Sequence, residues 1–231
     1  MRYRFKPWAL PQLKDSPYVC TDPEEYKNQW QKFFKDEDKD LSLELGSGNG
    51  RFILNIAQAR PEFNYLGIDI EPLVLAHTDT KLKELDLDNC RLLYLNINKI
   101  EDYFGKDEVS ELFINFPNPW PKRRQNKRRL THPRKLIQYR SFLKDKALVY
   151  FKTDSSDLYE DSLKYFTEMG FKIIKHSDRL ITEDITDEKA IMTEYEERWR
   201  KAGKDIKAIV AKKIEADEEE LKLKAKNYID T

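Results

Sequence analysis

The stretch from Phe116 to Leu130 reads FPNPWPKRRQNKRRL and joins a stiff polar turn to a dense run of cations. Its prolines fix backbone φ angles and remove amide donors, which favours a rigid loop around Asn118 and Trp120. The run that follows has no acidic residue and contains Lys122, Arg123, Arg124, Lys127, Arg128 and Arg129. Basic runs are often only solvated surface, but one without interleaved acids favours phosphate contact, because each cation can release counterions. The pattern predicts a segment that holds a polyanion beside a reactive pocket.

A second motif, ELGSGNG beginning at Glu44, indicates what fills that pocket. Gly46, Gly48 and Gly50 lie within five residues although the whole chain has seven glycines, so the backbone there turns with positive φ or approaches a ligand closely. A strand-to-helix turn alone does not need three glycines. The spacing departs from the GxGxxG pattern of dinucleotide sites, since Arg51 takes the last position. Glu44 adds negative charge, which disfavours a pyrophosphate and suits S-adenosylmethionine, a ligand with an amino group and a sulfonium.

Three polar residues after neighbouring predicted strands suit the rest of that cofactor. Asp69 ends one strand and is placed for two ribose hydroxyls. Asn96 and Asn98 follow the next strand and are candidates for the adenine edge. Ordinary turn chemistry, which asparagine favours, explains these two equally well.

The proline-rich turn contains the residue that we expect to face the substrate. A stiff loop can hold Asn118 against an extruded base while Trp120 shapes the pocket. The alternative is that Trp120 fills an edge of the core and the prolines only end the strand. We favour a site, because Asn118 is polar and follows directly after an apolar strand.

Two further stretches carry polar groups at the ends of elements. Phe151-Lys-Thr-Asp154 ends a predicted strand with Asp154. Thr193-Glu-Tyr-Glu196 matches the [ST]xx[DE] pattern of a helix capping box, a role that does not prevent its side chains from also facing a cleft.

Strands alternate with helices along most of the chain. The expected strands are 41–45, 64–70, 91–95, 111–116, 147–152, 171–175 and 206–211, and the expected helices are 22–30, 50–60, 71–86, 133–143, 155–169 and 193–201. Such alternation predicts a mostly parallel sheet covered by helices on both faces. Ligands of these sheets bind at the carboxyl ends of strands, where most of the motifs above fall.

Composition sets the outer limits. The 231 residues have 42 basic and 42 acidic side chains, so local rather than net charge must attract a charged partner. The two cysteines and three histidines show no metal-ligand spacing, and no apolar run approaches a membrane span. We expect no metal, a cytoplasmic protein, and three parts: an N-terminal arm and helix (1–40), a catalytic domain (41–214) and a charged tail (215–231).

Taken together, these residues resemble the bacterial tRNA (guanine-N7-)-methyltransferase family over nearly the whole chain. The similar segments are MRYRFKPWA, YKNQW, LELGSGNGRF, NYLGIDIE, NFPNPWPKRRQNKRRL, YFKTDSSDLYEDSL and TEYEERWRKAGKDI. The resemblance implies a Rossmann-like class I methyltransferase with a seven-stranded sheet whose last strand is antiparallel. It also implies S-adenosylmethionine as donor and the variable-loop guanosine of tRNA as acceptor. It implies no protein partner and leaves monomer and homodimer open.

By position, the resemblance also assigns residues to roles. Glu44, Asp69, Asn96 and Asn118 match cofactor-side residues, to which the glycine loop adds Gly46, Gly48 and Gly50. The substrate-side positions are Lys122, Arg124, Lys127, Arg128, Arg129, Asp154, Thr193, Glu194, Tyr195 and Glu196. Asn118 and Asp154 are the candidate catalytic residues.

Three departures from the family's pattern bear on activity. The family usually has Asp at positions 96 and 118 and His at position 125, where this chain has Asn96, Asn118 and Gln125. Asparagine keeps the shape of aspartate but not its charge. Two alternatives therefore stay open: methylation of an exocyclic amine, since Asn-Pro-Trp is similar to the NPP-aromatic signature of such enzymes, and a tRNA-binding homologue of weakened activity.

Overall fold

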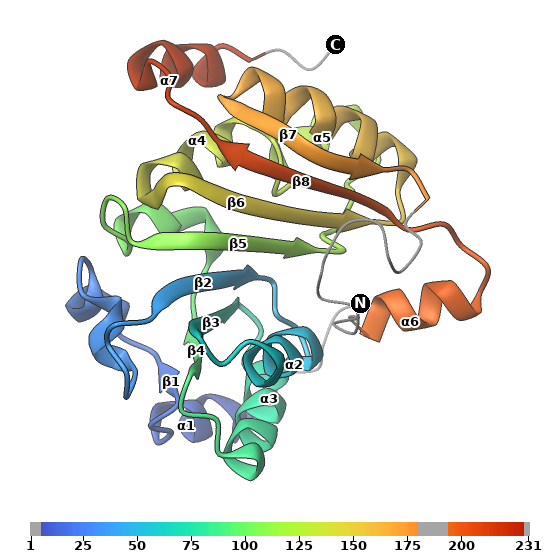
Figure 1. The fold of residues 1–231 in the computed structure, drawn as a ribbon. Coiled ribbons are helices and arrows are strands. Elements are labelled where there is room, and N and C mark those ends of the chain that lie inside the picture. The colour runs from blue at the N-terminus through green and yellow to red at the C-terminus, as the bar shows by residue number, and fades with distance from the viewer. Residues whose placement is uncertain (1–5, 180–193, 229–231) are drawn as a thin grey trace.

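The computed structural model describes residues 6–179 and 194–228, and in it one sheet runs through the protein (Figure 1). Its eight strands lie in the order β1-β4-β3-β2-β5-β6-β8-β7. They are β1 (Val19–Cys20), β2 (Asp40–Leu45), β3 (Phe63–Asp69), β4 (Cys90–Tyr94), β5 (Val109–Asn115), β6 (Leu143–Thr153), β7 (Phe171–Ser177) and β8 (Lys207–Lys213). The α-helices are α1 (Ala9–Lys14), α2 (Arg51–Ala59), α3 (Pro72–Leu85), α4 (Pro133–Phe142), α5 (Ser156–Glu168), α6 (Glu194–Lys201) and α7 (Glu218–Lys226).

The strand order identifies where a ligand binds. The pairs from β1 to β6 are parallel, whereas β8 is antiparallel to both β6 and β7. Apart from β1, this is the expected Rossmann-like sheet with an antiparallel last strand. The order reverses between β2 and β5, and ligands of such sheets bind outside the carboxyl ends of the strands at this point.

The prediction of seven strands missed β1. Val19 and Cys20 pair with Leu92 and Leu93 at the free edge of β4. A strand of two residues is too short to show a period-2 pattern, so only the tertiary pairing reveals it. The N-terminal arm thus extends the sheet by one strand.

Helices cover both faces of the sheet, as expected. On one face α1, α2 and α3 bury a core that includes Leu13, Ile53 and Leu75. On the other, α4, α5 and α7 pack over a larger core that includes Tyr139, Phe166 and Trp30. None of the helices in the described ranges is long and apolar enough to span a membrane.

The α-helix expected over residues 22–30 is absent and the prediction was wrong. Two 3₁₀ turns, η1 (Pro23–Tyr26) and η2 (Trp30–Phe33), lie there instead, and Asp22 makes no side-chain cap. Asn28 between them has a φ of 65°, which no α-helix accommodates. The break lets Trp30 bury its ring against Phe104 and donate its indole N–H to the Tyr103 carbonyl at 2.9 Å.

The charged tail forms α7 and packs onto the domain. Asp217 caps α7 by accepting from the backbone N–H groups of Glu219 and Glu220. Beneath the helix, the fully buried Arg140 donates to Glu218 and to the Ile214 carbonyl, which ties the tail to α4.

Candidate active site

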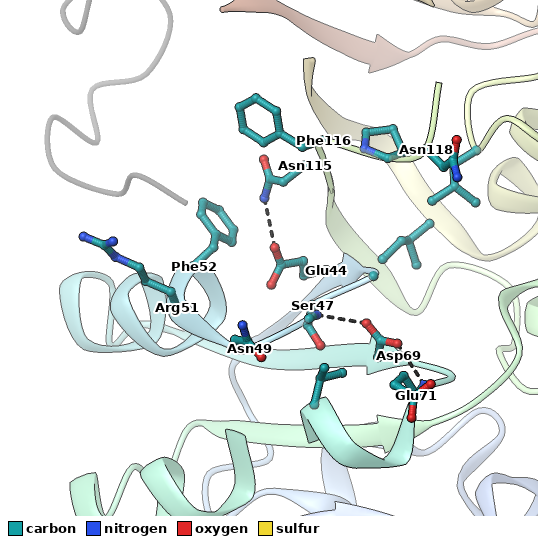
Figure 2. Close-up of a pocket in the computed structure, with 16 residues that line it drawn as sticks. Glu44, Ser47, Asn49, Arg51, Phe52, Asp69, Glu71, Asn115, Phe116 and Asn118 are labelled. Carbon is teal, nitrogen blue, oxygen red and sulfur yellow. Dashed lines mark hydrogen bonds between the residues drawn. The ribbon is translucent and has the colours of Figure 1, made fainter. Parts of the chain in front are cut away.

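A cleft of about 320 Å³ opens at the switch point, at the carboxyl ends of β2, β3 and β5 (Figure 2). Its lining includes the predicted residues Glu44, Gly46, Gly48, Asp69 and Asn118. Residues that lie more than seventy positions apart in the sequence, such as Glu44 and Asn118, therefore face one space. The structure thus gathers most of the predicted cofactor-side residues.

Glu44 is the group in this cleft with the most perturbed chemistry. It is only 2% exposed, and its Oε1 accepts from Asn115 Nδ2 at 3.0 Å. Its buried Oε2 has no hydrogen-bond partner among the residues that the structure describes. Burial raises the pKa of the Glu44 carboxyl to about 8, and the charge of Asp69 adds to the rise, while the Asn115 hydrogen bond opposes it. A buried acceptor of this kind fits a ligand that brings a positive charge or an N–H donor.

The glycine loop is shaped by positive φ angles and braced by Asp69. Gly46, Gly48 and Gly50 have φ of 79°, 52° and 75°. Two features exclude a side chain at Gly50. Its φ is positive, and a Cβ there would lie 2.1 Å from Cγ2 of Thr78. Asp69 accepts from the backbone N–H groups of Gly48 and Glu71, each at 2.9 Å. The carboxylate predicted to hold ribose thus also holds the loop in place.

Asn96 lies apart from this cleft. It lines a neighbouring cavity of about 370 Å³ together with Ile70 and Tyr94. Its Oδ1 accepts from the backbone N–H of Asn98 at 3.0 Å and caps η3 (Ile97–Asp102). The turn chemistry that was the alternative for this pair is present in the structure.

The proline-rich turn forms the rim of the cleft as a strained elbow. Asn118 is exposed there, and its Oδ1 accepts from the backbone N–H of Trp120 at 3.1 Å. Phe116 and Trp120 flank it with φ of 47° and 44°, a conformation that bulky residues adopt only when their surroundings impose it. Such strain is common at ligand-binding sites, and here it fixes where Asn118 emerges.

Arg129 supplies part of that constraint, which changes its predicted role. It is 3% exposed, its Nε donates to the Pro119 carbonyl at 2.8 Å, and it forms an ion pair with Asp161 of α5. Its charge is therefore neutralised within the protein, where the side chain holds the elbow against α5. The sequence pattern assigned it to phosphate contact because burial cannot be read from an unbroken basic run.

The other cations of the segment are exposed, as phosphate contact requires. Residues 123–128 form the 3₁₀ helix η4 (Arg123–Arg128). Lys122, Arg124, Lys127 and Arg128 are all exposed on or beside it. The guanidinium of Arg128 lies 5.1 Å from the centre of the Trp120 ring, so the cationic segment folds back onto the elbow.

The remaining substrate-side predictions lie outside the lining of the cleft or outside the described residues. Asp154 directly follows β6, does not line the cleft, and pairs with Lys204 at 3.7 Å. Thr193 lies outside the described residues. Glu194, Tyr195 and Glu196 begin α6, but their side chains also lie outside the described part of the chain.

Sequence reasoning missed several residues of the cleft. Asn115, Phe116, Arg51 and Glu71 line it and were not predicted as site residues. Asn115 offered a signal, because it is the one polar residue in the apolar stretch from Leu112 to Phe116. Arg51 offered none beyond its place after the glycines.

Comparison with known proteins decides the family. A family model described as "Putative methyltransferase" matches residues 38–209. A tRNA (guanine-N(7)-)-methyltransferase of Clostridium acetobutylicum is 42% identical over 214 residues, which cover 91% of this chain and 99% of that protein. One of Clostridium tetani is 43% identical over 212 residues, covering 92% and 99%. The chain belongs to the tRNA (guanine-N(7)-)-methyltransferase family.

Solved structures similar to this family member show the class I methyltransferase fold. The 16S rRNA methyltransferase KamB superposes with a TM-score of 0.59 at 15% identity, covering 92% of this chain and 96% of that one. A structure described as an antibiotic-related methyltransferase gives 0.56 at 20% identity, covering 80% and 92%. At these identities the likeness concerns the fold alone.

The cleft of this methyltransferase fits S-adenosylmethionine by its own chemistry. The unpartnered Oε2 of Glu44 suits a cationic ligand, and the glycine loop leaves its backbone open to close approach. Asp69 and Glu71 place carboxylates on the same rim, where hydroxyl groups of a ribose can donate to them.

Proposed function

We propose that this enzyme transfers a methyl group from S-adenosylmethionine to N7 of the variable-loop guanine of tRNA. The observation that carries the proposal is the position of Asn118. It lies on the wall of the cleft that contains Glu44, and it opens the same loop that continues into the exposed cations from Lys122 to Arg128. A buried acidic pocket and a phosphate-binding surface therefore meet at one rim.

The cofactor would be held by the β2, β3 and glycine-loop residues. S-adenosylmethionine, when bound, supplies an electrophilic methyl carbon on a sulfonium. Burial raises the pKa of Glu44 and so favours its neutral form in the free protein, whereas the positive charge of such a ligand favours the carboxylate. Asp69 would hold the glycine loop in place beside the ligand by accepting from the backbone N–H of Gly48.

The acceptor atom determines what the substrate side must do. Guanine N7 has a free lone pair in the neutral base, so no general base is needed and alignment of the reacting atoms is the main requirement. In A-form RNA this atom faces a deep and narrow major groove, so the base must leave its stack to react. The strained elbow offers a rigid edge for such a base, while the exposed cations hold the flanking phosphates.

Asparagine at position 118 is compatible with this role. Its Oδ1 is engaged by the Trp120 N–H, so the residue shapes the elbow without needing a charge. The charge that an aspartate would add can come from Asp154, which directly follows the neighbouring strand β6 and has a side chain that is 29% exposed.

Methyl transfer to unmodified tRNA tests the proposal. Purified protein, radiolabelled S-adenosylmethionine and a tRNA transcript should yield 7-methylguanosine in the nucleoside digest. A methylated exocyclic amine in that digest would favour the first alternative. Cofactor binding without any incorporation would favour the tRNA-binding homologue.

A further inference from the structure

An ion pair ties helix α6 to the cofactor side of the cleft. Glu197 of α6 pairs with Arg51, the first residue of α2 and part of the cleft lining. Figure 2 shows the Arg51 side chain pointing away from Glu44, out of the cleft. The guanidinium nearest the glycine loop is therefore engaged by a carboxylate of another element.

The same helix also contacts the substrate side. Trp199 packs against the small buried cluster of Ile206, Ala208 and Val210, against which Phe116 of the elbow also packs. Lys204, just after α6, lies 3.6 Å from the centre of the Trp199 ring and pairs with Asp154. Through the Arg51 ion pair and the cluster shared with Phe116, α6 is thus linked to both rims of the cleft.

Glu197 is stabilised as an anion at this place. Hydrogen bonds from Lys201 and then from Arg51 lower the pKa of its carboxyl, and Lys201 Nζ lies 2.8 Å from it. The pair itself is partly exposed, with 39% of the Arg51 side chain and 32% of the Glu197 side chain accessible. A partly exposed pair is weak enough for another carboxylate to displace.

The start of α2 is a favourable place for such a carboxylate. A helix N-terminus attracts anions through its unpaired N–H groups, and α2 begins directly after the glycine loop. A guanidinium binds a carboxylate in a bidentate manner and adds to that attraction. The amino-acid part of S-adenosylmethionine carries a carboxylate of this kind.

We propose that Arg51 binds the carboxylate of S-adenosylmethionine and that Glu197 holds the guanidinium until the cofactor replaces it. This inference rests on the proposed function, because it requires that cofactor. Cofactor binding then releases the Glu197 end of α6, next to the substrate-side residues Glu194, Tyr195 and Glu196. If cofactor binding raises the affinity for an RNA that contacts the released α6, thermodynamic linkage requires that this RNA raise the affinity for the cofactor by the same factor.

Calorimetric binding of two ligands tests the exchange. Decarboxylated S-adenosylmethionine keeps the sulfonium, amine and adenosine but lacks the carboxylate. Arg51→Gln should weaken binding of S-adenosylmethionine about tenfold and leave the decarboxylated ligand within about twofold. Glu197→Gln should strengthen binding of S-adenosylmethionine about two- to fivefold and again leave the other ligand unchanged. Arg179→Gln, which breaks the exposed pair with Asp205, is the matched control and should change neither affinity.

Hydrogen exchange supplies a second readout. Amides of α6 should exchange faster when S-adenosylmethionine binds and should not respond to the decarboxylated ligand. Equal weakening of both ligands by Arg51→Gln, weaker cofactor binding by Glu197→Gln, or slower exchange in α6 would each overturn the inference. Absence of S-adenosylmethionine binding to the unaltered protein would instead overturn the proposed function on which it rests.

Discussion

The two rims of the cleft are built in opposite ways. The cofactor rim consists of the glycine loop and the buried Glu44, whose carboxyl has a pKa raised to about 8. The substrate rim, from Asn118 to Arg128, is exposed and cationic, and its shape comes from backbone strain. The first rim is suited to recognising one small ligand closely, and the second to holding a large polyanion through many weak contacts. Substitutions on the first should therefore act through fit, and those on the second through charge.

The largest effect is expected at Gly50. Gly50→Ala places a Cβ against Thr78 and forces alanine to a φ of 75°. Left-handed backbone costs about 1–2 kcal/mol and overpacking about 1–3 kcal/mol more, so the loop should shift and calorimetry should detect no S-adenosylmethionine binding. Gly203→Ala is the control, because Gly203 has a φ of 70° and open space around it. If Gly50→Ala binds cofactor as tightly as Gly203→Ala does, close fit is not what the loop provides.

Glu44→Gln should lower affinity for S-adenosylmethionine by about tenfold or more, because it removes a charge-assisted contact while keeping the shape. In the unaltered protein, affinity should rise as pH rises toward 8, since ionisation of Glu44 then no longer has to be driven by the ligand. The variant should lose that pH dependence. The affinity for S-adenosylhomocysteine, which lacks the sulfonium, should change less with this substitution than the affinity for S-adenosylmethionine. A pH profile that is identical in the two proteins would contradict the role of Glu44.

The same shift predicts the stability of the ligand-free protein. A carboxyl whose folded pKa lies above its unfolded value contributes stability below the unfolded pKa, and this is lost as pH rises through about 8. Glu44→Gln removes the buried charge, so its advantage in unfolding free energy should grow from pH 5 to pH 8. Urea denaturation of both proteins at several pH values measures this difference in unfolding free energy. A difference that shrinks as pH rises would contradict the burial argument.

The substrate rim offers a pair of adjacent arginines with different expected effects. Arg128→Ala should weaken tRNA binding and reduce the slope of log affinity against log salt by about 1, with stability unchanged. Arg129→Ala should leave the salt slope unchanged and lower the unfolding free energy by about 2 kcal/mol, less than for a fully buried pair because the Asp161 side chain is 40% exposed. Filter binding across a salt series and thermal unfolding separate the two. Equal changes of salt slope in both variants would show that Arg129 reaches RNA.

These two arginines also show how far the sequence can be read. The strand–helix alternation was enough to predict a mostly parallel sheet with helices on both faces, whereas the antiparallel last strand came from the resemblance to the family. Glu44 and Asn118 were placed on one cleft because both lie at the carboxyl ends of predicted strands. Nothing in KRRQNKRRL distinguishes Arg129 from Arg128, since the difference lies in Asp161 and Pro119, which tertiary packing brings there. Asn115 and Arg51 were missed for the same reason, because their partners Glu44 and Glu197 are distant in sequence.

The smallest effect is expected at Asn118. Asn118→Asp keeps the oxygen that accepts from Trp120, and the residue is exposed, so the rate of methyl transfer should change by about threefold at most. Single-turnover kinetics with saturating cofactor measure it. A gain of more than about a hundredfold, equivalent to nearly 3 kcal/mol of transition-state stabilisation, would identify the natural asparagine as the mark of a weakened enzyme.

The central claim is that the cleft presents one methyl donor to one nitrogen of an extruded purine. A tRNA transcript in which 7-deazaguanine replaces only the variable-loop guanine removes that nitrogen and leaves the rest of the RNA intact. We predict that this transcript binds as the normal one does and accepts no methyl group from S-adenosylmethionine. Undiminished methylation of the substituted transcript would contradict the account.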